Sequence, residues 1–178
     1  MTALSIFLAG NDLTSELLGR PVDLQATLPY TGLMLALFAA STALAEVLPS
    51  FAELKQLYQK ILSPQLQDIP VWGLAVMAVG AGVGEETFFR GFLQTWLTDT
   101  TSSVGTGILG ASVVFGALHA ATPSYFVFAT AAGVIFGAEY VVVGLPEAAF
   151  THALYDFFAF IAILQLWGHR NTSQEKEM

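Results

Sequence analysis

The chain has 178 residues, of which 54% are hydrophobic and only 11% are charged, and its mean hydropathy is +0.63. Soluble domains carry about a quarter charged residues, so this composition excludes an ordinary solvated surface and predicts an integral membrane protein. The net charge of −8 argues against nucleic-acid binding, which requires a basic surface. The absence of cysteine excludes disulfides, thiolate metal ligands and cysteine nucleophiles.

Five apolar stretches approach the length that crosses a bilayer, which predicts an all-α, polytopic membrane helix bundle. The expected spans are residues 28–48, 70–97, 104–121, 125–143 and 147–167. They form one membrane domain over residues 28–168, with an N-terminal lead-in at 1–27 and a solvated tail at 169–178. A short polar loop, residues 98–103, separates the second span from the third. Because the later turns are short, we expect spans two to five to pack as an antiparallel bundle.

Residues 50–62 have a different, amphipathic pattern, in which apolar side chains recur at helical spacing with lysine and glutamine between them. Ser50 and Glu53 have the spacing of a capping box, which predicts the helix start, and Pro64 predicts its end. We expect this helix to lie along the membrane interface.

Basic residues outside the spans predict the orientation of the chain. Lys55 and Lys60 follow the first span, and Arg170 and Lys176 lie in the tail, against only Arg20 before the first span. The positive-inside rule then places the first loop and the tail in the cytoplasm. Within the spans, Gly133 and Gly137 have the four-residue spacing that allows close helix packing in lipid.

Ionisable residues within membrane spans are costly and usually functional or paired. Away from the span ends they are Glu85, Glu86, Arg90, His119, Glu139, His152 and Asp156. All but Glu139 fall on the second, third and fifth spans, so they can converge in one small bundle. No role for Glu139 follows from its position in the sequence.

Two pairs within this set have i,i+4 spacing and share a helix face: Glu86 with Arg90, and His152 with Asp156. Each pair has a purely structural interpretation, as an ion pair or as a hydrogen bond between a histidine and an acid. A neutralised Glu86–Arg90 pair, however, leaves Glu85 about 100° away on the helix with no partner. His119, at the end of the third span, is a candidate partner and is equally compatible with a helix–helix hydrogen bond.

A carboxylate and a histidine can together activate a water, and a second histidine with an acid can stabilise an oxyanion. This predicts hydrolysis of a peptide bond without a covalent intermediate, since no serine stands in a Gly-x-Ser-x-Gly context. A set of Glu85, His119 and His152 can also hold a divalent metal such as zinc, although no His-Glu-x-x-His motif is present. The residue types alone leave both mechanisms open.

Three motifs resemble the signature of the CPBP intramembrane protease family, which includes the CAAX prenyl endopeptidases and is also called the Abi family. They are Glu85-Glu86-x-x-x-Arg90, Phe115-x-x-x-His119 and His152-x-x-x-Asp156. The resemblance covers about residues 70–160, and the three motifs occur in the family's order. The first span and the N-terminal segment match no feature of the family.

The resemblance implies that Glu85 and His119 activate the catalytic water. It also implies that Glu86 and Arg90 support the site and that His152 and Asp156 form the oxyanion side. The expected catalytic residues are therefore Glu85, Glu86, His119, His152 and Asp156, with Arg90 in support. Many members carry asparagine at the position of Asp156, and an acid there donates to an oxyanion only when protonated.

The implied activity is endoproteolysis of a membrane-tethered or prenylated, CAAX-like protein, and the family is named as metalloproteases. Two other functions use the same residue types. One is a non-catalytic membrane protein that binds a peptide such as a bacteriocin, in immunity or regulation. The other is a small proton-coupled transporter, although transporters more often show two related halves with broken helices.

Overall fold

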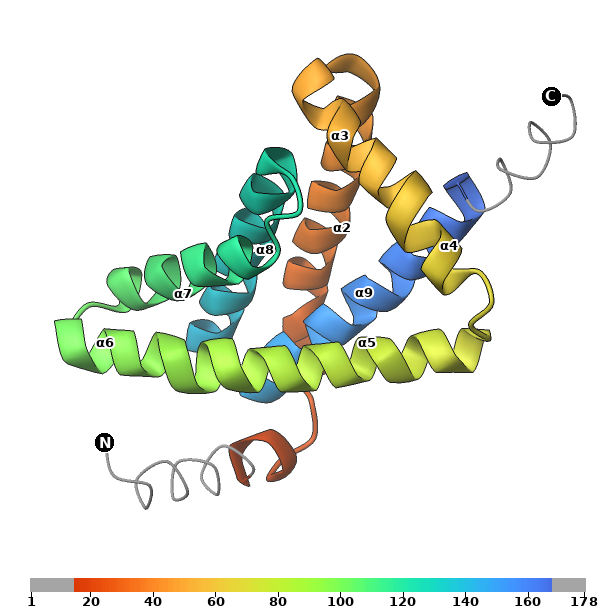
Figure 1. The fold of residues 1–178 in the computed structure, drawn as a ribbon. Helices are drawn as coiled ribbons and strands as arrows, with labels where there is room; N and C mark the ends of the chain where they lie inside the picture. Colours follow the sequence, from red (N-terminus) through yellow and green to blue (C-terminus); the bar gives the residue numbers. More distant parts are fainter. Residues whose placement is uncertain (1–14, 168–178) are drawn as a thin grey trace, which may run out of the picture.

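The computed structural model describes residues 15–167, and every regular element in this part of the chain is a helix (Figure 1). The expectation of an all-α membrane bundle is therefore confirmed. The expected N-terminal lead-in lies partly, and the solvated tail wholly, outside the described residues.

Helix α2 (Leu24–Val47) begins four residues before the expected first span. The reason is a side-chain cap, because Asp23 Oδ1 accepts hydrogen bonds from the backbone N–H of Gln25 and Ala26. Pro29 consequently lies inside the helix rather than at its start.

The amphipathic segment forms three short helical pieces: α3 (Pro49–Leu57), the π-helix η1 (Tyr58–Leu62) and α4 (Ser63–Leu66). The expected end at Pro64 is wrong, since this proline lies in the first turn of α4, where its missing N–H breaks no α-helical bond of that element. The start at Ser50 is also displaced, because α3 already begins at Pro49.

Helix α5 (Val71–Glu86), the π-helix η2 (Thr87–Gln94) and α6 (Thr95–Thr101) follow one another as a single long rod, which crosses the lower part of Figure 1. The expected loop at 98–103 is wrong, because helix persists to Thr101. The chain turns only at Ser102, whose φ of 54° is left-handed. Ser103 then caps the next helix.

The remaining elements are α7 (Val104–Leu118), α8 (Pro123–Val142) and α9 (Leu145–Trp167). Three of the described helices are long and apolar enough to cross a membrane: α2, α8 and α9. A fourth crossing arises only if the bent pair Phe51–Leu66 and Val71–Thr101 counts as one span, with an angle of 116° between its arms. By the length and composition of the described helices, the chain thus has three or four candidate membrane spans and not the expected five. Helix α7 is only 15 residues long, about 22 Å at 1.5 Å per residue, against a hydrocarbon core of about 30 Å.

Close backbone contacts bring α5 against α9 and α7 against α8. A Cβ atom added to Gly82 would lie 2.5 Å from the carbonyl oxygen of Ala149 on α9, and one added to Gly133 would lie 2.9 Å from Cβ of Ser112 on α7. Only glycine fits at either position. The packing expected for Gly133 therefore occurs, and Gly82 makes the equivalent contact for the helix that carries the two glutamates.

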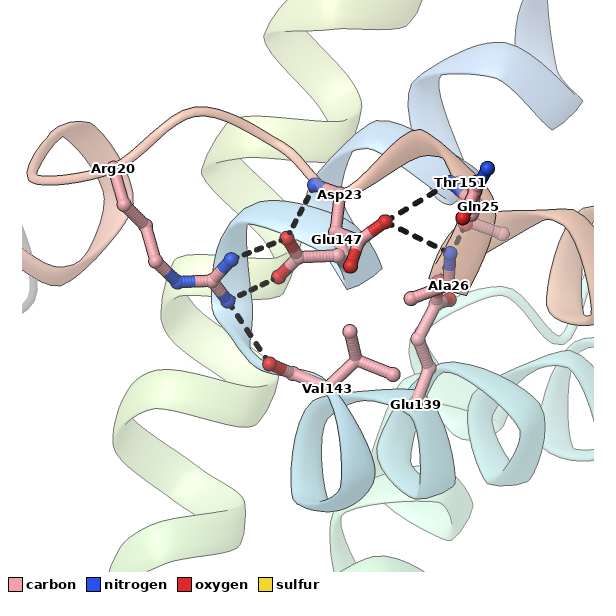
Figure 2. A network of polar contacts seen from close by, with 8 residues as sticks. All are labelled: Arg20, Asp23, Gln25, Ala26, Glu139, Val143, Glu147 and Thr151. Atoms are coloured by element: carbon pink, nitrogen blue, oxygen red, sulfur yellow. Dashed lines mark hydrogen bonds and ion pairs between the residues drawn. The ribbon is translucent and has the colours of Figure 1, made fainter.

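A polar clamp joins the segment before α2 to the hinge between α8 and α9 (Figure 2). The guanidinium of Arg20 donates to both carboxylate oxygens of the buried Glu147, at 2.6 and 2.5 Å, and to the carbonyl of Val143. The backbone N–H of Asp23 donates to the same carboxylate. Gly144, with φ of +134°, leaves the space that Arg20 occupies, because an added Cβ would lie 2.6 Å from its Nη2.

Candidate active site

The six ionisable residues expected to converge do so, from the end of α5, from η2, from the C-terminal cap of α7 and from the middle of α9. Glu86 occupies the centre of the buried part. One oxygen, Oε2, accepts from Nε of Arg90 at 2.8 Å, and the other, Oε1, lies 2.8 Å from Nδ1 of His152. The Glu86 and Arg90 side chains are completely buried, so Glu86 is fully engaged with protein partners.

Glu85 projects elsewhere, as the helical rotation requires. Its Oε2 lies 3.7 Å from Nε2 of His119, and about a third of its side chain is exposed. This separation is longer than a hydrogen bond. Glu85 and His119 therefore face each other without a direct hydrogen bond, and Glu85 Oε2 is a buried acceptor with no hydrogen-bond partner among the described residues.

The protonation of His119 follows from its other ring nitrogen. Nδ1 lies 2.8 Å from the carbonyl oxygen of Phe115, and a carbonyl can only accept, so Nδ1 carries the proton. Nε2 is the ring nitrogen that faces Glu85, and in the neutral tautomer it carries the lone pair. Phe115 also stacks on the imidazole at 4.3 Å between ring centroids, which fixes its orientation.

The orientation of the His152 ring is also fixed by its contacts. The Glu86 carboxylate, paired with Arg90, accepts from Nδ1, and Phe136 stacks on the ring at 4.5 Å with an interplanar angle of 7°. Nε2 lies 3.6 Å from Oδ2 of Asp156 one turn further along α9. His152 can donate from both nitrogens only as the imidazolium, and Glu86 and Asp156 are placed to balance that charge.

A cavity of about 140 Å³ gathers the exposed parts of this arrangement. Four of its lining residues are Glu85, His119, His152 and Asp156, whereas Glu86 and Arg90 are not on its wall. The rest of the lining is apolar or aromatic and includes Tyr58, Tyr125 and Tyr155. This is a small polar site within an apolar pocket, as binding sites for apolar ligands usually are.

The three tyrosines were not singled out in the sequence. A signal was available, because a tyrosine hydroxyl in a membrane bundle needs a polar environment as much as a carboxylate does. Glu139, for which the sequence suggested no role, is buried on α8 and accepts a hydrogen bond from Thr151 Oγ1 at 2.7 Å. Thr151 precedes His152, so Glu139 braces the backbone of α9 beside the site.

The candidate metal ligands Glu85, His119 and His152 lie on three different helices. Among the described residues, no three histidine, aspartate or glutamate side chains lie close enough together to hold one ion. Glu85, His119 and His152 are therefore not gathered into one ligand set in this arrangement.

The fold and the cavity define a helical, multi-pass membrane protein with carboxylates and imidazoles facing one buried pocket. The family Type II CAAX prenyl endopeptidase Rce1-like matches residues 67–158, which is more than half of the chain. The chain belongs to this family of CAAX-type intramembrane proteases, as its motifs led us to expect. No curated protein and no solved structure matches the chain.

Proposed function

We propose that this protein is an intramembrane endopeptidase that hydrolyses a peptide bond in a membrane-tethered or prenylated, CAAX-like substrate. The observation that carries this proposal is the division of the two adjacent glutamates. Glu86 is buried, and both of its carboxylate oxygens have protein partners, whereas Glu85 faces the cavity opposite Nε2 of His119. A purely structural polar cluster gives no reason for a second glutamate that lacks a hydrogen-bond partner.

In the proposed mechanism, a water lies between Glu85 and Nε2 of His119. Glu85 takes one proton of this water as its oxygen attacks the scissile carbonyl carbon, and His119 accepts a hydrogen bond from the other proton. The carbonyl oxygen becomes an oxyanion, which accepts a hydrogen bond from Nε2–H of His152 and from Asp156 when that acid is protonated. Glu85 then gives its proton to the departing amide nitrogen, and the carbon–nitrogen bond breaks.

Glu86 and Arg90 act as positioning residues in this scheme, because they lie behind the cavity wall. Glu86 fixes the orientation of His152 through Nδ1, and Arg90 fixes Glu86 by donating to its other carboxylate oxygen. The apolar lining of the cavity suits either a prenyl chain or an ordinary hydrophobic peptide. The basic residues favour a cytoplasmic location for the first loop and the tail. The apolar cavity lining favours a substrate that is bound to the membrane.

The test is cleavage by the purified protein in liposomes. Quenched fluorescent peptides of one sequence would be presented in prenylated and in unmodified form, and the products identified by mass. We expect cleavage by the wild type and none by Glu85→Gln or His119→Ala. Cleavage of the prenylated peptide but not of the unmodified peptide would show that the protein recognises the prenyl group.

The same assay separates the chemical alternatives. Activity that survives a strong chelator supports water activation by Glu85, and activity lost in chelator and restored by zinc shows a metalloprotease. A wild type that binds peptides without cleaving them would favour the non-catalytic function, and proton flux through the liposome membrane would favour the transporter.

A further inference from the structure

Tyr125 shares the cavity with the four ionisable residues that line it, and it belongs to none of the three motifs. Its backbone is fixed at the first turn of α8. Thr122 caps this helix by accepting from the N–H of Tyr125 at 3.1 Å, and Pro123 occupies the first turn. The tyrosine therefore projects from a rigid helix start, directly after the short segment that follows His119.

The ring of Tyr125 is held between two others. It meets His119 edge to face, with 6.3 Å between centroids, and stacks on Phe128 at 6.0 Å with an interplanar angle of 13°. Tyr125, Asp156 and Glu85 line the same cavity. Its hydroxyl, however, makes no hydrogen bond to the part of the chain that the structure describes. A neutral donor is thus positioned near the reacting groups without an internal acceptor.

The cavity has few other donors of this kind. His152 is one donor on the wall, but Glu85 as a carboxylate and the unprotonated Nε2 of a neutral His119 are acceptors, and Asp156 donates only when it is protonated. A phenol keeps its proton throughout the neutral range. Of the other two tyrosines on the wall, Tyr58 hydrogen bonds to Ser41, and the ring of Tyr155 packs edge to face on Phe38, away from the His119 ring that Tyr125 contacts.

We propose that the hydroxyl of Tyr125 is a further catalytic group, which donates a hydrogen bond to the scissile carbonyl oxygen as it becomes an oxyanion. This inference rests on the proposed function. No bond to Tyr125 forms or breaks, and its proton stays on the phenol oxygen throughout. It compensates for Asp156, which donates to an oxyanion only when it is protonated, whereas an amide donates at every pH.

The experiment compares Tyr125→Phe with wild type and with a matched control, Tyr140→Phe. Tyr140 lies on the same helix, and its hydroxyl contacts Thr95 outside the cavity at 3.0 Å. Loss of one oxyanion donor lowers kcat by about 10²–10³-fold in known cases. We expect a decrease in kcat of at least about 30-fold for Tyr125→Phe, with KM changed by less than about threefold. Tyr140→Phe should retain both parameters.

Inhibitor affinity separates a catalytic role of Tyr125 from a structural one, because a structural role would not weaken binding of a transition-state analogue selectively. A phosphinate peptide, which carries an anionic oxygen at the reacting centre, should lose affinity for Tyr125→Phe by the same factor as kcat. A non-cleavable ground-state peptide should bind both proteins equally. Equal kcat in Tyr125→Phe and wild type, or equal loss for both inhibitors, would overturn the proposal. A wild type without activity would instead remove the proposed function itself, and this inference with it.

Discussion

Oε1 of Glu86 and Nδ1 of His152 lie 2.8 Å apart, although 66 residues separate them in the chain. The contact joins α5 to α9 at the position where the motifs of both helices meet. Gly82, one turn before Glu86, allows the approach because its missing side chain leaves room for the backbone of α9. The same contact leaves the neighbouring Glu85 as the glutamate that faces the cavity.

Arg90 should be essential for stability rather than for chemistry. Arg90→Met removes one partner of a fully buried ion pair and leaves the Glu86 charge uncompensated, which costs about 3–5 kcal/mol of unfolding free energy. Adding Glu86→Gln removes that charge, so the double variant should be less destabilised than the sum of the single variants. Unfolding in detergent measures all three, and strict additivity would show that the pair is not coupled.

Gly82 and Gly80 provide a matched pair on one helix. A Cβ at Gly82 would overlap the backbone of α9, whereas one at Gly80 meets nothing within 4 Å. Gly82→Ala should destabilise the protein by about 1–3 kcal/mol through overpacking, and it should lower activity by displacing Glu86 from His152. Gly80→Ala should be neutral or stabilising, by up to about 1 kcal/mol, through helix propensity. Equal effects at the two positions would contradict the packing described here.

The clamp between Arg20 and Glu147 should contribute far more stability than a surface ion pair. Hydrogen bonding to Glu147 raises the pKa of Arg20 above its ordinary value, so Arg20 stays charged at any working pH. Arg20→Ala leaves the buried Glu147 carboxylate without its main donor, at a cost of about 1–3 kcal/mol. Lys55→Ala, which removes the exposed pair with Glu46, should cost less than about 1 kcal/mol. The difference between the two unfolding free energies tests the clamp.

Asp156 should be replaceable by asparagine and not by alanine. The amide of Asp156→Asn can donate to an oxyanion at every pH, whereas the acid must be protonated to do so. We therefore expect Asp156→Asn to keep activity within about tenfold of wild type and to resist the decline of wild-type activity at rising pH, whereas Asp156→Ala should lose about 10²-fold or more. Parallel pH–rate profiles for Asp156→Asn and wild type would exclude a donor role for this acid.

Much of the site could be predicted because ionisable residues are rare in membrane spans and their spacing is regular. The i,i+4 spacing of Glu86 with Arg90 and of His152 with Asp156 identified two contacts that the structure contains. The spare position of Glu85 followed from the helical rotation alone. Tyr125 could not be predicted, because a tyrosine that lines a cavity and one that packs in the core look the same in the sequence.

Other features depend on contacts between distant segments and left no local signal. Glu147 looked like an ordinary acid near a helix start, and only the fold brings Arg20 onto it. The π-helix η2 was also missed, since i→i+5 bonding has no simple sequence pattern. The number of spans was overestimated because hydropathy records how apolar a segment is and cannot show that α7 ends at Leu118.

The division of roles between Glu85 and Glu86 is the central claim, and one paired measurement tests it most directly. Glu85→Gln and Glu86→Gln would each be assayed for kcat on the same cleavable peptide and for unfolding midpoint in the same detergent. We predict that Glu85→Gln keeps its midpoint within about 2 °C and loses kcat by at least about 10²-fold. Glu86→Gln should lower the midpoint clearly, because it breaks the buried contacts to Arg90 and His152. A Glu85→Gln protein that still cleaves at near wild-type rate, or a Glu86→Gln protein of unchanged stability, would contradict the account.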